Sequence, residues 1–157
     1  MGYFNQYVRA ESLEEAYGLY QKKNNFVLGG MLWLKMRKRP FGTAIDLSDL
    51  GLDQIEEDEK EFRIGAYVSL RELETNEALN TYTKGAFAES VKHIVGVQFR
   101  NVATVGGSLW GRYGFSDVMT IFRAMGAKVQ LHHAGILDLD EFVNCLLYTS
   151  DAADDKA

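Results

Sequence analysis

The stretch QFRNVATVGGS, residues 98–108, ends in the turn that decides how this chain folds. Its last five residues set two glycines, Gly106 and Gly107, between two hydroxyl side chains, those of Thr104 and Ser108. Successive N–H groups in a glycine turn can form a nest that binds an anion. We therefore expect this turn to hold a phosphate group.

A second glycine pair, Gly29 and Gly30, lies between two apolar segments. We predict a strand at residues 25–28 and a helix at residues 31–39, ending before Pro40. Glycine can take a positive φ, and the N–H groups at the start of a helix attract phosphate. Any tight turn from strand to helix favours glycine as well, so this pair alone is not specific. Together, the two glycine turns could grip a pyrophosphate from both sides.

Neither glycine pair fits the two best-known nucleotide-binding patterns. The dinucleotide-binding pattern G-x-G-x-x-G is absent, and no lysine follows either pair at the offset that the P-loop pattern requires. We therefore disfavour a Rossmann fold and a P-loop fold.

The rest of the chain alternates helical and extended patterns. A strand at residues 43–47 would join the strand at 25–28 in a small parallel layer with right-handed helical crossovers. Beyond residue 50, polar and apolar residues alternate around an acidic turn, which indicates a β-hairpin. The expected hairpin strands are residues 54–57 and 61–64, and a further strand is 128–132. The expected helices are 12–22, a short one opening at Ser69, 84–94 and 117–125, with capping boxes at Ser12 with Glu15 and Ser69 with Glu72, and an N-cap at Ser116.

Composition places the chain among ordinary soluble globular domains. It has 157 residues, of which 46% are hydrophobic and 25% charged, enough for a buried core. Its apolar runs are far shorter than the roughly 20 residues that cross a bilayer, and its first residues do not resemble an export signal, so we expect a cytoplasmic protein without a membrane segment. A net charge of −5 argues against nucleic-acid binding, which needs clustered lysine and arginine. Anionic ligands would thus be bound by backbone N–H groups.

Metal ligands and reactive thiols are scarce. The one cysteine, Cys145, has no partner for a disulfide, a zinc site or an iron–sulfur cluster. His93, His132 and His133 have no carboxylate or cysteine at metal-ligand spacing, so a solvent-exposed or packing role is preferred for each. We predict no metal site. Redox chemistry would use an organic cofactor or the metal of a partner.

Three residues after the turn at 104–108 have two interpretations each. Trp110 and Tyr113 could stack on an aromatic ring system, but large aromatic side chains are more often part of a core, and we favour packing. Asp117 could accept hydrogen bonds from a ribose hydroxyl or favour the start of its helix, and the sequence leaves both open. No residue is nominated as a catalytic acid, base or nucleophile.

Three blocks of the sequence resemble the FAD-binding domain of molybdopterin dehydrogenases. They are FVLGG at residues 26–30, IGAYVSL at 64–70 and, most specifically, QFRNVATVGG at 98–107. That family includes the flavin subunits of xanthine dehydrogenase, carbon monoxide dehydrogenase and nicotinate dehydrogenase, and it has the p-cresol methylhydroxylase-type FAD fold. The likeness runs from about residue 3 to residue 142.

The resemblance implies an α+β fold of two small α/β subdomains with the flavin between them. The first, residues 1–52, would have a short parallel sheet with helices, and the second, residues 53–145, a mixed to antiparallel sheet. The implied contacts of the FAD pyrophosphate are Leu28, Gly29, Gly30, Met31 and Leu32 on one side and Thr104, Gly106, Gly107 and Ser108 on the other, with Asp117 at the adenosine end.

Two positions depart from the family pattern. Met31 and Leu32 stand where members commonly have a Thr-Asp pair, which removes a hydroxyl ligand from the first turn. Ser108 stands where asparagine is usual, a milder change because a polar donor remains.

Family flavin subunits work with an iron–sulfur subunit and a molybdopterin subunit. Electrons pass from molybdenum through the clusters to FAD and usually on to NAD+, so the resemblance implies these partners for this chain. Family members also carry a further C-terminal domain. We therefore expect a truncated chain in which residues 146–157 are a non-native tail.

The sequence thus predicts an oxidoreductase subunit that transfers electrons through FAD and is inactive without its partner subunits. The alternative is a scaffold module without redox activity, or a fragment too incomplete to retain FAD. A flavoenzyme that oxidises its own small substrate ranks lower, because substrate-binding and catalytic groups are not evident.

Overall fold

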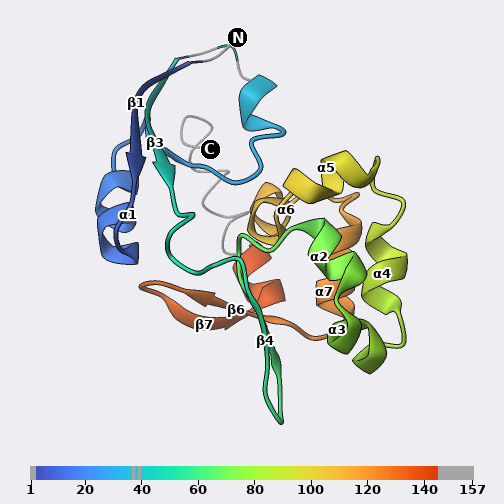
Figure 1. The fold of residues 1–157 in the computed structure, drawn as a ribbon. Coiled ribbons are helices and arrows are strands. Elements are labelled where there is room, and N and C mark those ends of the chain that lie inside the picture. Colours follow the sequence, from blue (N-terminus) through green and yellow to red (C-terminus); the bar gives the residue numbers. More distant parts are fainter. Residues whose placement is uncertain (1–2, 37, 39, 145–157) are drawn as a thin grey trace.

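The computed structural model describes residues 3–36, 38 and 40–144. Its first part is a three-stranded parallel sheet, in the order β1-β3-β2, with one helix against it (Figure 1). The predicted small parallel layer is confirmed, but its first strand, β1, is not among the predicted elements, because four of its six side chains are exposed and its apolar pattern is weak. The elements are β1 (Phe4–Arg9), α1 (Leu13–Tyr20), β2 (Phe26–Val27) and β3 (Phe41–Asp46).

A small core holds α1 against this sheet. Ile45 of β3 is fully buried and packs with Ala16 of α1. At the start of α1, the Ser12 hydroxyl accepts the N–H of Glu15 at 3.1 Å, as predicted. The Glu15 carboxylate accepts the N–H of Glu11, so the second half of the predicted capping box is wrong by one residue.

The helix predicted for residues 31–39 does not form. The described part of this segment contains one 3₁₀ turn, η1 (Leu34–Met36), after Met31 at a φ of 58°. A residue with a left-handed φ cannot lie inside a right-handed α-helix, so Met31 cannot be its first helical residue. Trp33 and Met36 are 55% and 59% exposed, so the segment buries little apolar surface. Because packing of an apolar face supplies most helical stability, a short segment without one stays non-helical.

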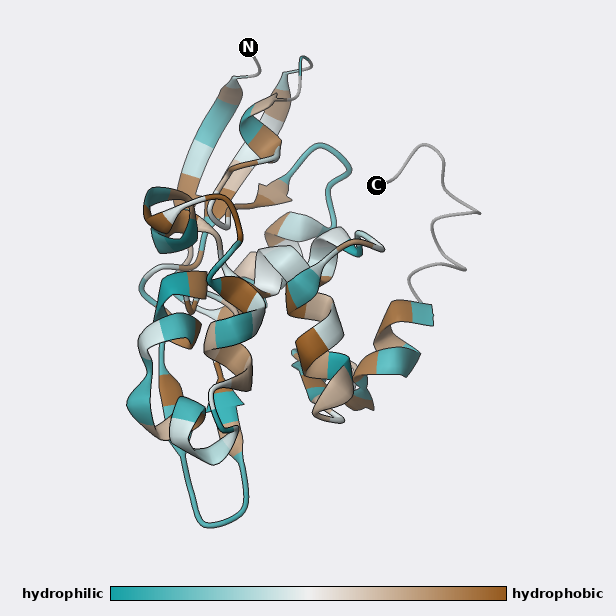
Figure 2. Cartoon of the chain, turned by 90° about the vertical axis from the view of Figure 1, so that its right-hand side faces the viewer, coloured by the Kyte–Doolittle hydropathy of each residue, from teal (hydrophilic) through white to brown (hydrophobic). Residues whose placement is uncertain are grey.

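The second part is helical and carries two antiparallel hairpins. The hairpin predicted around the acidic turn is confirmed, and its connection is hydrophilic throughout (Figure 2). The predicted strand at residues 128–132 is confirmed as β6, so the α+β fold class holds. The strands are β4 (Ile55–Glu57), β5 (Phe62–Ile64), β6 (Lys128–Leu131) and β7 (Gly135–Asp138), and the helices are α2 (Leu70–Thr75), α3 (Glu77–Tyr82), α4 (Ala86–Val91), α5 (Val97–Val102), α6 (Val105–Gly111) and α7 (Asp117–Ala124).

One larger core holds the second part together. The rings of Phe87 on α4 and Phe122 on α7 lie there, edge to face, with centroids 5.1 Å apart. Leu32 of the first part also packs against this core. The division at residue 52 remains a prediction, and the tail expected at residues 146–157 lies outside the described residues. Among the described helices, none is long and apolar enough to span a bilayer.

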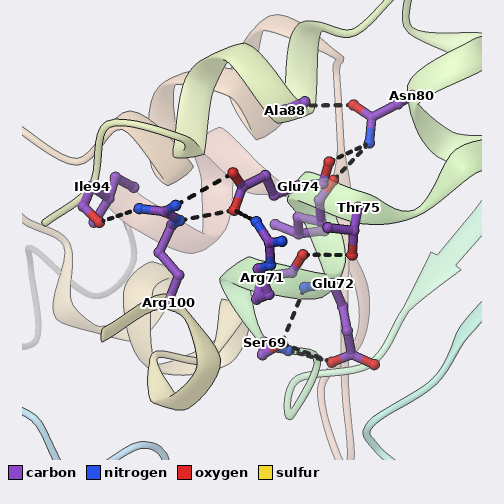
Figure 3. Close-up of polar contacts among 10 residues, drawn as sticks. Ser69, Arg71, Glu72, Glu74, Thr75, Asn80, Ala88, Ile94 and Arg100 are labelled. Atoms are coloured by element: carbon purple, nitrogen blue, oxygen red, sulfur yellow. Dashed lines mark hydrogen bonds and ion pairs between the residues drawn. The ribbon is translucent and has the colours of Figure 1, made fainter. Parts of the chain in front are cut away.

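A buried ion pair fixes α5 against α2 (Figure 3). Arg100 is only 5% exposed, its Nε lies 2.9 Å from the Glu74 carboxylate, and its Nη1 donates to the Ile94 carbonyl at 3.1 Å. Arg71 contacts the same carboxylate at 2.8 Å. Burial raises the pKa of Glu74, but hydrogen bonds from both arginines outweigh it, so that pKa lies below its ordinary value. Because α5 runs directly into residue 103, this ion pair fixes where the second glycine segment begins.

Candidate functional site

The two glycine segments lie against each other. A Cβ added at Gly30 would lie 2.0 Å from the carbonyl oxygen of Val102, and one added at Gly29 would lie 3.0 Å from Oγ1 of Thr104. The two segments are about seventy residues apart in sequence, yet their backbones are in contact. The structure therefore brings together the two turns that the sequence analysis singled out.

The first glycine pair is needed for this close approach and not for a special backbone angle. Neither Gly29 nor Gly30 has a positive φ, so that expectation is wrong, and the left-handed residue is Met31. Any side chain at Gly30 would meet the backbone of Val102, which cannot rotate away as a side chain could. Only glycine fits there without moving one of the two segments.

The first segment also presents a row of unused donors. The Leu28 N–H still belongs to the sheet and donates to the Ile45 carbonyl at 2.8 Å. Within the described residues, the next four N–H groups donate to no acceptor. They belong to Gly29, Gly30, Met31 and Leu32. Gly29 is exposed and Gly30, Met31 and Leu32 are half-buried, so these four consecutive donors are open to water or to a bound anion.

The second segment differs from its prediction, because residues 104–108 are the N-cap and first turn of α6. The Val105 N–H donates to the Val68 carbonyl at 2.9 Å, and the Gly106 N–H donates to the Ala66 carbonyl at 2.8 Å. The predicted nest of free N–H groups is therefore wrong. The cause is the chain at residues 66–70, which lies alongside and uses these donors.

Two more N–H groups of this turn, those of Gly107 and Ser108, are capped within the turn itself, whereas within the described residues the Thr104 N–H has no acceptor. The Thr104 hydroxyl accepts the Gly107 N–H at 3.2 Å, and the Thr104 carbonyl accepts both the N–H and the hydroxyl of Ser108. Within the described residues, the Thr104 hydroxyl proton has no acceptor, and Gly107 is exposed. The second segment thus offers two donors from Thr104, its hydroxyl and its N–H, and an exposed backbone surface at Gly107.

Tyr67 ties the two segments together, and the sequence analysis gives it no role. Its hydroxyl donates to the Leu28 carbonyl and accepts the Leu47 N–H at 3.1 Å. Burial raises the pKa of this phenol. Tyr67 lies one residue after Ala66, whose carbonyl binds Gly106, so one short segment positions both glycine turns. The resemblance to the family at residues 64–70 was the sequence feature that could have pointed to Tyr67.

Exposed aromatic rings extend from both segments. The rings of Trp33 and Tyr113 lie 5.2 Å apart, Tyr113 stacks on Phe115 at 5.2 Å, and Trp110 meets the edge of Tyr20 at 6.5 Å. Tyr113 is 38% exposed and Trp110 is 50% exposed, so neither belongs to the core. They pack on other surface rings and not in the core, and stacking on a ligand remains the alternative interpretation.

Asp117 lies at the first position of α7. The predicted N-cap is confirmed, since the Ser116 hydroxyl accepts the Met119 N–H at 3.2 Å. The Asp117 side chain is exposed and, within the described residues, makes no hydrogen bond. A place in the first turn suits the helix dipole, and an exposed carboxylate is also free for a ribose hydroxyl, so both interpretations remain.

A comparison of the sequence with known families decides between the folds that could hold such a site. Residues 3–150 match the family described as the FAD binding domain in molybdopterin dehydrogenase. The chain belongs to this family. FAD is therefore its cofactor, as the resemblance of the three sequence blocks implied. A curated relative, the uncharacterized protein YgfM of Escherichia coli strain K12, is 27% identical over 147 residues, which are 89% of this chain and 54% of YgfM.

Solved structures share the fold of this FAD-binding chain. Carbon monoxide dehydrogenase from Oligotropha carboxidovorans superposes with a TM-score of 0.75 at 22% identity, over 87% of this chain and 50% of that one. The carbon monoxide dehydrogenase of Hydrogenophaga pseudoflava gives 0.72 at 24% identity, over 88% and 51%. Quinoline 2-oxidoreductase from Pseudomonas putida 86 gives 0.71 at 19% identity, over 87% and 49%. The chain thus spans about half the length of the relatives it matches.

Replacing Tyr67 with phenylalanine should weaken both the fold and FAD binding. The loss of both hydrogen bonds of this hydroxyl, to the Leu28 carbonyl and from the Leu47 N–H, should cost about 1–3 kcal/mol of unfolding free energy, measured by urea denaturation. Because the first segment then loses its anchor, we expect FAD affinity to fall by about threefold to tenfold. The control is Tyr82→Phe, whose ring is 68% exposed. Equal FAD affinity in Tyr67→Phe and the control contradicts an anchoring role.

Proposed function

We propose that the N–H groups of Gly29, Gly30, Met31 and Leu32 bind the diphosphate of FAD. The observation that carries this proposal is the row of four unused donors beside the Thr104 hydroxyl. A diphosphate offers several negatively charged oxygen acceptors, and backbone N–H groups bind such oxygens without lysine or arginine. The donors present therefore fit the group that the family binds.

The same geometry accounts for the unusual residues of the first segment. Met31 and Leu32 contribute N–H groups, so their apolar side chains cost the site one hydroxyl donor and not its main contacts. The Leu32 side chain packs against the larger core instead. This packing holds the N–H groups of the segment in place for the ligand.

On the other side of the diphosphate, we assign Thr104 the role of hydroxyl donor. Gly106 and Gly107 provide close approach, and the Ser108 hydroxyl supports the turn from behind through its bond to the Thr104 carbonyl. We place Asp117 at the adenosine end, where its free carboxylate accepts from the ribose. When FAD is bound, its isoalloxazine ring supplies the redox chemistry, and the residues of the chain bind and orient it.

We further propose that the chain is the FAD-binding part of an oxidoreductase subunit in a molybdenum hydroxylase complex. An iron–sulfur subunit would deliver electrons, a molybdopterin subunit would oxidise the substrate, and NAD+ would accept the electrons from FAD. The support is family membership together with a shared fold with a copper- and molybdenum-containing carbon monoxide dehydrogenase. We assign the complex to the cytoplasm.

A ligand series tests the diphosphate proposal. The full chain is titrated with FAD, ADP and riboflavin, with the fluorescence of its two tryptophans, Trp33 and Trp110, as readout. FAD and ADP carry a diphosphate and riboflavin does not, so riboflavin should bind at least about tenfold more weakly than FAD, a difference of about 1.4 kcal/mol. ADP should displace FAD. Riboflavin binding as tightly as FAD refutes the proposal.

The second candidate function is a module that does not retain FAD. It is favoured by one observation, that Met31 and Leu32 stand where members of the family commonly have a Thr-Asp pair, which removes a hydroxyl ligand from the first turn. The flavin released on denaturation of the chain, purified after co-expression with the iron–sulfur and molybdopterin subunits, discriminates the two. A complex that releases no flavin favours the second candidate, and one that releases one flavin per chain favours the first.

A further inference from the structure

Three side chains from distant parts of the sequence converge at the surface, away from the glycine segments. The Glu14 carboxylate on α1 lies 3.0 Å from Nε2 of His132 and 3.3 Å from Nε2 of His133, through the same oxygen. Both histidines belong to the turn between β6 and β7. Glu14 and His132 are 118 residues apart, which is why sequence spacing gave no sign of this cluster. The sequence shows no carboxylate near these histidines, but in the folded chain the Glu14 carboxylate lies beside both of them.

The spacing of these three atoms matches a metal coordination shell. Zinc binds imidazole nitrogen at about 2.0–2.1 Å and carboxylate oxygen at about 2.0–2.2 Å, so tetrahedral ligand atoms lie about 3.3–3.5 Å from each other. The two measured separations from the carboxylate oxygen are 3.0 and 3.3 Å, and all three ligand atoms lie within 4.8 Å of one another. A metal ion would fit among them once the two imidazole nitrogens, which lie within 4.8 Å of each other, are brought to about 3.5 Å by small rotations of the exposed side chains.

The fold holds these side chains in place. Neighbouring residues of a regular strand point to opposite faces, but His132 and His133 lie in a turn, where both rings can face α1. The ring of Tyr17, one helical turn after Glu14, packs against His133 with centroids 4.1 Å apart and against His132 at 6.2 Å.

We propose that Glu14, His132 and His133 form a binding site for a divalent transition metal ion such as Zn²⁺. Two imidazole nitrogens with one carboxylate suit zinc, copper, nickel or cobalt, whereas magnesium and calcium prefer ligand sets made entirely of oxygen. All three side chains are exposed, which leaves a fourth coordination position open to water or to a partner. The bound ion would clip α1 of the first part to the β6–β7 hairpin of the second.

Metal titration of the full chain tests this site. Tag-free protein carrying Cys145→Ser, which removes the one thiol of the chain, is titrated with Co²⁺ followed by its visible absorption and with Zn²⁺ by calorimetry. We expect one ion per chain. His132→Ala and His133→Ala should each weaken binding at least about tenfold, and Glu14→Gln should weaken it as well. The matched control is His93→Ala, the remaining histidine of the chain, which should bind like the parent protein.

A stability measurement provides an independent readout. The ligands converge only in the folded chain, so the ion binds the native state, and Zn²⁺ should raise the thermal midpoint of the parent protein and of His93→Ala. No rise is expected in the His132→Ala/His133→Ala double variant. Absence of metal binding to the parent protein, or equal binding by the double variant, overturns the proposal. Neither readout depends on FAD.

Discussion

Gly30→Ala is expected to abolish measurable FAD binding and to destabilise the fold. The added Cβ would lie 2.0 Å from the Val102 carbonyl oxygen and 2.7 Å from its carbonyl carbon. Because both are backbone atoms, the two segments must move apart, and overpacking of this kind typically costs about 1–3 kcal/mol. The four N–H donors then lose their position against Thr104, so FAD affinity should fall by at least about a hundredfold, below the range that the titration measures.

The control for this substitution is Gly18→Ala. A Cβ there would meet no atom within 4 Å, and alanine favours the interior of α1. Thermal unfolding and FAD titration of both variants show whether the effect comes from adding a methyl group to any glycine or from adding it at position 30. FAD binding by Gly30→Ala at parental affinity contradicts the requirement for close approach.

Arg100→Met is expected to cause the largest loss of stability, about 3–5 kcal/mol, because it leaves the Glu74 carboxylate without its best-buried partner. Arg71 also contacts that carboxylate but is itself 39% exposed, so it replaces Arg100 only in part. Urea denaturation measures the loss. The matched control is Arg63→Met, whose arginine is 63% exposed and whose ion pairs should contribute at most about 1 kcal/mol. Equal losses in the two variants refute the assigned role of Arg100.

The ion pair of Arg100 and Glu74 should also make the free energy of unfolding depend on pH in the acid range. The pKa of Glu74 is lower in the folded chain than its ordinary value of 4.5. The ionised Glu74 carboxylate therefore stabilises the folded chain fully above about pH 4.5. The contribution is lost as the pH falls through the folded-state pKa. Unfolding free energy should therefore drop below about pH 4.5, and Glu74→Gln should show a shallower drop over that range.

Features that depend on neighbouring residues were predictable from the sequence. Ser69 and Glu72 form both halves of the predicted capping box, since each accepts the other's backbone N–H. The helix predicted for residues 117–125 forms as α7, and Gly126 just beyond it has a φ of 63°, which ends the helix. The acidic turn likewise predicted the hairpin that β4 and β5 form. In each case the residues that form the contact lie within about ten positions of one another.

Features that depend on distant segments were not predictable. The N–H groups of Val105 and Gly106 looked free in the sequence, but the carbonyls of Val68 and Ala66 accept them. The role of Gly30 depends on the position of Val102, and no local pattern carries that information. The resemblance to a family identified the right segments, whereas the reason for each glycine came only from the folded backbone.

Backbone amide NMR of the full chain during FAD titration tests the central claim most directly. If the four unused donors bind the diphosphate, the ¹H–¹⁵N signals of Gly29, Gly30, Met31 and Leu32 should shift most, and ADP should shift them while riboflavin should not. Saturable FAD binding that leaves these four signals in place, with shifts only elsewhere in the chain, would contradict the account.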